Sequence, residues 1–343
     1  QEAMEALGES GARLPFSSLT RRYMDAFEGR DTSRPGQVRW WDAYFGDKRY
    51  MESADSYLRA LTYAPDASSV YFALADSLFA AGDFHYAAYA IRKGVTLDPD
   101  SEVLPLMGSK EGIMHISMAF LNPGDRVLIP DPGYPTYSSV TRLVGAEPVA
   151  YALSESRGWF PDLEALEAAG LEGVRLMWVS YPHMPTGATA DQDQFRELVD
   201  FARRNEILLV NDNPYSFVLS NRPLSILGTP GADGHVLELN SLSKTFNMAG
   251  WRVGMLLGAA PLLEAVLKVK SNMDSGMFYG IQKGAIAALQ SGPGWFDHLD
   301  ATYRRRRAGV FQIADRLGCT YDHRAVGMFV WARLPEGSPN SET

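Results

Sequence analysis

Five short apolar runs that alternate with helical segments constrain the fold of this chain more than any other feature. They are DRVLIP (125–130), RLMWVSYP (175–182), ILLVND (207–212), HVLELNSLS (235–243) and VGMLLG (253–258). Polar residues hardly interrupt these runs, which is the pattern of strands that are covered on both faces. Helical segments lie between them, for example 190–206, with Asp191 as the expected N-cap. The order predicts an α/β fold with a doubly wound, mostly parallel sheet.

Residues 38–100, ahead of these runs, have a helical pattern that repeats. Pro65 and Pro99 stand 34 positions apart, and the same shift relates Tyr50 to Phe84. This spacing resembles a tetratricopeptide repeat, a 34-residue helix-turn-helix unit. The sequence therefore predicts an α-helical, repeat-like segment before the α/β region, with a peptide as its expected partner. An amphipathic helical hairpin that packs on the α/β region is the alternative interpretation.

The charge pattern and cysteine usage exclude several classes of protein. The chain carries 41 acidic and 32 basic residues, a formal net charge of −9, and no basic stripe, so nucleic acid is not an expected partner. Its single cysteine, Cys319, cannot form an internal disulfide, and no apolar run approaches the roughly 18 residues of a membrane helix. His115, His183 and His235 have no second ligand at a metal-like spacing, so no metal is expected. A cytoplasmic protein is predicted.

Polar side chains follow the predicted strands at the points where the strands end. The third run ends in Asp212, with Tyr215 just beyond it, and the fourth run leads directly to Lys244. The loop GSKEG (108–112) opens a predicted helix, so its backbone amides and the Ser109 hydroxyl would face an anion. In doubly wound sheets the ligand site lies at the carboxyl ends of the strands. Each residue alone has an ordinary role as a cap, a turn or a solvated charge, but together they predict one site.

Five motifs carry a resemblance to a known family. In chain order they are LPLMGSKEGI, PGYPTY, MPTG, DNPYSF and SLSKTFNMAGWRVG. Over about 101–335 the chain resembles the fold-type I aminotransferases of class I and II, in the branch that includes diaminopimelate aminotransferase-like proteins. The resemblance implies pyridoxal 5'-phosphate as cofactor and ping-pong transfer of an amino group from an amino acid to a 2-oxo acid. It also implies a homodimer.

The resemblance implies a role for each site residue. Lys244 forms the imine with the cofactor aldehyde and then acts as the base at the substrate Cα. Asp212 keeps the pyridine nitrogen protonated, so that the ring becomes an electron sink. Tyr215 hydrogen-bonds the ring hydroxyl, and Tyr134 stacks on the ring face. The residues expected to bind the phosphate are Gly108, Ser109, Lys110, Ser241, Ser243 and Arg252.

Two departures from the family pattern bear on function. Met184 stands before PTG, where the family usually has an asparagine that binds the ring hydroxyl. A thioether is a weak acceptor and cannot donate, so the ring hydroxyl depends more on Tyr215, with His183 as a candidate helper. The segment GMFVWARLP (327–335) resembles the start of the C-terminal small domain, and no residue here can be assigned to the substrate α-carboxylate.

The expected organisation follows from these observations. It comprises an N-terminal segment (1–37), the repeat-like region (38–100), a cofactor-binding large domain (101–300) and the start of an incomplete small domain (301–343). The expected function is amino-group transfer through Lys244. A β-eliminating lyase is an alternative because the same lysine and electron sink serve that reaction. A cofactor-binding scaffold without catalytic activity, whose repeats bind peptides, is the alternative from a different class.

Overall fold

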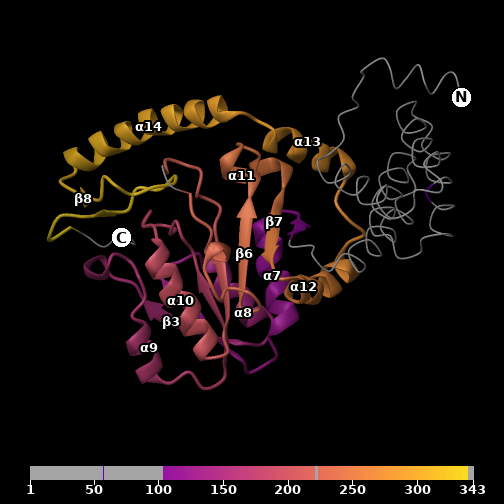
Figure 1. Ribbon diagram of the computed structural model, residues 1–343. Coiled ribbons are helices and arrows are strands. Elements are labelled where there is room, and N and C mark those ends of the chain that lie inside the picture. Colours follow the sequence, from indigo (N-terminus) through magenta and orange to yellow (C-terminus); the bar gives the residue numbers. More distant parts are fainter. Residues whose placement is uncertain (1–56, 58–102, 221–222, 339–343) are drawn as a thin grey trace, which may run out of the picture. The chain divides into compact units, whose positions relative to one another are not determined.

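The computed structural model describes residues 57, 103–220 and 223–338 (Figure 1). The chain divides into two units, residues 1–99 and residues 100–343. Two predictions fall outside the described residues: the N-terminal segment (1–37) and, apart from Tyr57, the tetratricopeptide-like region (38–100). The peptide partner expected for that region therefore stays a prediction. The α/β unit can therefore be compared with the sequence in detail.

Seven strands of the described chain form one sheet. In spatial order they are β1 (Val103–Leu106), β7 (Gly254–Gly258), β6 (Val236–Ser241), β5 (Leu208–Asp212), β4 (Val174–Val179), β2 (Arg126–Asp131) and β3 (Glu147–Ala152). Strand β7 runs antiparallel to both of its neighbours, β1 and β6; the pairs β6–β5, β5–β4, β4–β2 and β2–β3 are all parallel. The predicted mostly parallel α/β sheet is confirmed, and each of the five apolar runs contains a strand.

Helices cover both faces of this sheet. On one face α7 (Ser109–Phe120), α8 (Pro135–Leu143) and α12 (Ala260–Met273) pack in one apolar cluster, and on the other α9 (Leu163–Ala169) and α10 (Gln192–Arg204) pack in a second. Strand β4 serves both clusters, because Trp178 packs in the first and its neighbour Met177 in the second. Both side chains are fully buried. Two covered faces explain why the strands lack polar alternation.

Helix α10 begins where the sequence predicts. Asp191 Oδ1 accepts a hydrogen bond from the Gln194 backbone N–H at 2.9 Å, and Gln194 Oε1 accepts one from the Asp191 N–H at 3.0 Å. This reciprocal pair satisfies two amides that the helix itself leaves without partners. The buried positions Phe195, Leu198 and Ala202 then recur at helical spacing and face the sheet. Burial of each large apolar side chain contributes roughly 1.5–3 kcal/mol.

The last part of the described chain lies on the side of the sheet to which β6 points (Figure 1). This part contains α13 (Tyr279–Leu289), α14 (Pro293–Arg316), β8 (Thr320–Tyr321) and β9 (Ala332–Arg333), and the earlier short helix α11 (Leu242–Thr245) follows the end of β6. The described 3-10 helices are η1 (Glu155–Arg157), η2 (Ile226–Gly228) and η3 (Ala249–Trp251). Helix α14 runs without a break through residue 300, the border expected between the two domains, and that border stays a prediction. None of the helices that the structure describes has the length and hydrophobicity to cross a bilayer.

Candidate active site

The predicted site residues lie where neighbouring strands end. Strand β5 ends at Asp212, and its neighbour β6 ends at Ser241, from which α11 carries the chain to Lys244. The Asn213 N–H donates to the Leu239 carbonyl at 2.8 Å, so the two strands stay joined just past Asp212. This is the edge of a doubly wound sheet that binds ligands. The topology thus brings the acid and the lysine to one edge.

One oxygen of the Asp212 carboxylate accepts a hydrogen bond, and the other oxygen accepts none from the described residues. It is 5% exposed, and its Oδ2 accepts a hydrogen bond from the Tyr137 hydroxyl at 2.8 Å. The Tyr137 ring is held in turn by stacking on Trp178, with centroids 4.9 Å apart and planes 5° from parallel. Asp212 Oδ1 is buried and has no hydrogen-bond partner among the described residues. Both the orientation and the free oxygen are therefore built into the fold.

Burial raises the pKa of Asp212 to about 6, and the Tyr137 hydrogen bond opposes this rise. A buried carboxylate with an unpaired oxygen costs free energy, because water no longer solvates it and no protein donor replaces the water. A ligand that offers a cationic N–H to Oδ1 would recover that cost. The geometry therefore favours a positively charged, hydrogen-bonding ring nitrogen as the partner of Asp212.

Tyr215 lies in the turn after β5, close to this acid. Its side chain is buried, and burial raises the pKa of its hydroxyl well above the usual value, with a further contribution from the Asp212 charge. Its ring contacts Phe329 edge-on, with centroids 5.5 Å apart. A Cβ added at Gly327 would lie 3.5 Å from the Tyr215 Cβ, so the chain passes closely over it. The hydroxyl stays protonated at neutral pH and can donate to a ligand.

An anion cradle forms where the start of α7 meets the start of β7. Gly108, the N-cap of α7, has φ +85°, and a Cβ there would lie 2.9 Å from Cζ of the Arg252 guanidinium. A Cβ at Gly254 would lie 2.7 Å from the Ser109 amide nitrogen. Gly254 is also paired with Ser241 in the sheet. Glycine is thus required twice for close approach, which collects amides, a hydroxyl and a guanidinium at one point.

The remaining cradle residues extend this arrangement. Ser241 caps α11, and its Oγ accepts a hydrogen bond from the Ser243 N–H at 3.2 Å. Arg252 donates to the Ala249 carbonyl at 3.0 Å and has no carboxylate partner among the described residues. An arginine without an acidic partner beside a helix N-terminus suits a phosphate.

Two further predicted residues, Lys110 and Tyr134, lie beside the cradle. The Lys110 ammonium lies 5.6 Å from the centroid of the Tyr134 ring. Tyr134 is the N-cap of α8, and its ring meets Tyr137 edge-on with centroids 5.6 Å apart. Through Tyr137, the ring of Tyr134 is linked to the Asp212 carboxylate. The cradle and the buried acid are therefore two ends of one site.

Lys244 is half-buried in α11, one residue after Ser243. Within the described part of the chain, the Lys244 side chain forms no hydrogen bond or ion pair. An amine that is partly withdrawn from water and held by no carboxylate is available for reaction with a ligand. Its place beside the cradle fits the predicted role.

The loop after β4 contains Met184 and His183. His183 is buried, its Nδ1 lies 2.8 Å from Thr186 Oγ1, and its Nε2 has no partner among the described residues. Burial lowers the pKa of His183 to about 4, so the imidazole is uncharged at neutral pH. Met184 is half-buried. His183 as a helper at the ring hydroxyl stays a prediction.

Sequence reasoning did not find Tyr137 and Trp178, which orient the acid. Tyr137 stands in the motif PGYPTY, in which the resemblance implies a role only for Tyr134. The signal was present, since Tyr137 follows Tyr134 by about one helical turn and both face the same site. Trp178 has no such signal, because an aromatic residue in an apolar strand is an ordinary core residue.

Comparisons with known proteins identify the family of the chain. A family model described as aminotransferase class I and II matches residues 80–340. The chain is 42% identical over 257 residues to an LL-diaminopimelate aminotransferase from Oleidesulfovibrio alaskensis, covering 74% of this chain and 66% of that protein. It is 41% identical over 251 residues to an LL-diaminopimelate aminotransferase from Dehalococcoides mccartyi, covering 73% and 65%.

Solved structures give the same result. Substrate-bound BacF from Bacillus subtilis has a TM-score of 0.68 at 35% identity, covering 71% of this chain and 63% of that one. A probable N-succinyldiaminopimelate aminotransferase from Thermus thermophilus has a TM-score of 0.65 at 32% identity, covering 69% and 64%. The chain thus spans slightly less than two thirds of the length of these curated relatives. It belongs to the aminotransferase class I and II family.

Proposed function

We propose that this chain is a pyridoxal-phosphate-dependent aminotransferase that moves an amino group from an amino acid to a 2-oxo acid. Members of its family use this cofactor. The observation that carries the proposal is the buried, unpartnered Oδ1 of Asp212, at the same sheet edge as Lys244 and the cradle. A binding protein without catalytic activity has no need for a reactive lysine that is free of other partners.

The residues present fit the cofactor at both of its ends. Asp212 offers an anionic acceptor to the protonated pyridine nitrogen, and Arg252 with the Gly108 loop offers donors to the phosphate. When bound, the cofactor supplies an aldehyde that reacts with amines and a cationic ring that withdraws electrons. The protein supplies orientation, charge and proton transfer around that chemistry.

Each catalytic residue then has one task. Lys244 would hold the cofactor at its aldehyde, and its amine would hold or move a proton at the substrate Cα. Asp212 keeps the ring nitrogen protonated, because an anion favours the charged form of its neighbour. Tyr215 donates a hydrogen bond to the ring hydroxyl; Met184 cannot share this task, since a thioether has no proton to donate.

The cradle residues hold the cofactor in place. We assign the phosphate to Gly108, Ser109, Lys110, Ser241, Ser243 and Arg252, and Tyr134 to the ring face. Support for this comes from the close approach of Arg252 to Gly108 and from the cap that Ser241 provides for α11. Charge-assisted hydrogen bonds to a phosphate are among the stronger polar contacts in proteins.

The proposed assembly is a cytoplasmic homodimer, as is typical of the family. Two large apolar side chains near the end of α12 are exposed in the single chain, Met273 at 60% and Phe278 at 68%, and a second copy would cover such residues. Light scattering after size-exclusion chromatography measures the mass directly.

A Lys244→Ala substitution tests the proposed reaction. Purified protein is titrated with pyridoxal phosphate and its visible absorbance recorded, and a panel of amino acids with 2-oxo acids follows. LL-diaminopimelate leads the panel because two relatives are named for it. The wild type is expected to develop a visible band that amino acids change, while the variant loses that band and about 10²- to 10⁴-fold of its rate. Lys268→Ala, an exposed position on α12, is the matched control.

The outcomes separate the candidate functions. A band that depends on Lys244 but that no amino acid changes would support a cofactor-binding scaffold instead. Release of a β-substituent and ammonia from an amino acid would support the lyase. Absence of any band would contradict the site assignment.

A further inference from the structure

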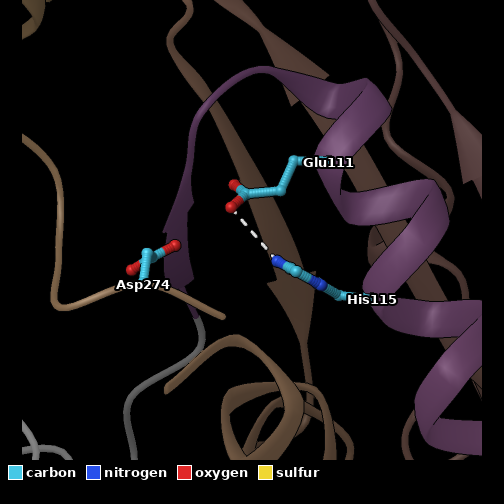
Figure 2. Close-up of side chains that lie close together, drawn as sticks. All are labelled: Glu111, His115 and Asp274. Atoms are coloured by element: carbon cyan, nitrogen blue, oxygen red, sulfur yellow. Dashed lines mark hydrogen bonds and ion pairs between the residues drawn. The ribbon is translucent and has the colours of Figure 1, made fainter. Parts of the chain in front are cut away.

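A buried ion cluster lies beside the anion cradle. Figure 2 shows Glu111 and His115 on α7 facing Asp274, which follows α12. His115 Nε2 lies 3.1 Å from Glu111 Oε1. The Lys270 ammonium joins the two acids, at 3.1 Å from Glu111 Oε1 and 2.6 Å from Asp274 Oδ2. These four residues are called the α7–α12 cluster below.

The α7–α12 cluster already contains its cation. Glu111, His115 and Asp274 bring one ligand atom each within 4.8 Å of one another, a spacing at which a metal could be held. However, the Lys270 ammonium contacts both carboxylates. A buried lysine with two acid partners satisfies the charges without a metal. The cluster is therefore an internal ion network, and its function must come from what it holds in place.

The cluster reaches the cradle through Glu111. The second oxygen of this carboxylate, Oε2, accepts a hydrogen bond from the Met107 backbone N–H at 2.5 Å. Met107 directly precedes Gly108, whose left-handed backbone lies against Arg252. On the other side, Asp274 Oδ1 accepts a hydrogen bond from the Gly276 N–H at 2.9 Å. One network thus fixes the backbone of the cradle and the turn after α12.

The charges of the cluster are strongly held. The Lys270 side chain is 7% exposed and that of Glu111 is 12% exposed. Burial alone would raise the pKa of Glu111, but hydrogen bonds from His115 and Met107 and the charge of Lys270 outweigh it and lower that pKa to about 2. Glu111 is an anion at neutral pH. Without Lys270, this carboxylate would keep only its contacts with His115 and the Met107 N–H, and its charge would lie without a lysine partner in the first turn of the helix that begins at the cradle.

We propose that Glu111 and Lys270 are positioning residues for the phosphate of the cofactor. Glu111 fixes the Met107–Gly108 backbone so that its amides and Arg252 converge, and Lys270 neutralises the carboxylate that does this. The inference rests on the proposed function, because it takes pyridoxal phosphate as the ligand of the cradle. Neither residue touches the reacting atoms.

Two double variants that lack both the Glu111 and the Lys270 charge test the role of the acceptor. Glu111→Gln with Lys270→Met keeps a carbonyl oxygen for the Met107 N–H, whereas Glu111→Leu with Lys270→Met removes it. Both leave the Asp274 carboxylate without Lys270 but with its hydrogen bond from the Gly276 N–H, so this loss is the same in the two variants and cancels when they are compared. Lys270→Met alone tests neutralisation, and Glu167→Ala, which removes a surface ion pair with Arg204, is the control. Thermal unfolding without cofactor checks the fold of each variant.

The measurement is the dissociation constant for pyridoxal phosphate and for pyridoxal, which lacks the phosphate. The glutamine double variant is expected to keep the wild-type ratio of the two constants, and the leucine double variant to lose about tenfold in pyridoxal phosphate affinity alone. Lys270→Met alone is expected to weaken the binding of pyridoxal phosphate at least as much as the leucine double variant does. Equal losses for both ligands, or no difference between the double variants, would overturn the proposal. Wild-type protein that binds neither ligand would instead contradict the proposed function.

Discussion

Two buried carboxylates on adjacent strands have opposite surroundings. Asp212 at the end of β5 and Glu238 in the middle of β6 are 5% and 1% exposed, and they face opposite sides of the sheet. Both oxygens of Glu238 accept hydrogen bonds: Oε2 at 3.0 and 3.1 Å, Oε1 at 3.3 and 3.4 Å, from donors on Asn211, Ile226, Asn240 and Asn213, respectively. Asp212 has one bond at Oδ2 and none at Oδ1 within the described chain.

The difference separates a structural acid from one kept for a ligand. Burial raises the pKa of both groups, and hydrogen bonds oppose the rise in both. Only around Glu238 do the protein's own donors satisfy the whole carboxylate. A buried polar atom without a partner is rare in native proteins and needs a reason. At Asp212 the proposed reason is the ring nitrogen of the cofactor.

Removal of the Glu238 charge is expected to give the largest effect on stability. In Glu238→Gln the new side-chain NH2 group, which is a donor, would face N–H groups that now donate to the Glu238 carboxylate. The free energy of unfolding should therefore fall by about 2–3 kcal/mol. Urea unfolding of the cofactor-free protein measures this. Glu167→Gln, on the surface, should change the same quantity by less than about 0.5 kcal/mol. An unchanged stability in Glu238→Gln would mean that the two acids do not differ as described.

The equivalent change at Asp212 should have the opposite sign. Asp212→Asn removes an unpaired buried charge, so the cofactor-free variant should be about 1–2 kcal/mol more stable than wild type at pH 7. Since the pKa rises from 3.8 to about 6 on folding, the unfolded chain loses this proton first. The contribution of Asp212 to wild-type stability therefore falls as the pH rises from about 4 to about 6.

The variant lacks this titration, so the gap between the two proteins should be small at pH 4 and level off above about pH 6. Unfolding curves at several pH values over this window measure the gap. A gap that stays constant with pH would contradict the assigned ionisation.

The smallest effect is expected at Tyr137, the single donor to the Asp212 carboxylate among the described residues. Tyr137→Phe removes a hydrogen bond to a charged group and should destabilise the protein by about 1 kcal/mol at pH 7. The pKa of Asp212 should rise further, because the Tyr137 bond lowers it. In an Asp212→Asn background the same substitution should cost less, and a double-mutant cycle gives the difference. Full additivity would show that the two side chains are not coupled.

Much of the fold could be predicted because it depends on local pattern. The apolar runs of β2, β4, β5, β6 and β7 predict a sheet covered on both faces, and the capping pair at Asp191 predicts the start of α10. The strands β1 and β3 could not be identified this way. They lie at the two edges of the sheet, where exposed residues interrupt the apolar pattern and Pro148 removes a strand signal.

The site divides in the same manner. Asp212, Tyr215 and Lys244 follow predicted strands, so strand ends reveal them. The partners that orient them come from distant parts of the chain, since Tyr137 and Asp212 are 75 positions apart and Lys270 and Glu111 are 159 apart. No spacing rule in a single sequence predicts such contacts.

The most direct test compares wild type with Asp212→Asn, each with and without saturating pyridoxal phosphate, by urea unfolding at pH 7. A ligand that binds only the folded state raises stability in proportion to its affinity. Without cofactor the variant should be the more stable protein. With cofactor the wild type should be the more stable one, because only the wild type has an anionic Oδ1 that can pair with a protonated ring nitrogen. If the order of stability stays the same after cofactor is added, Asp212 is not held for that nitrogen.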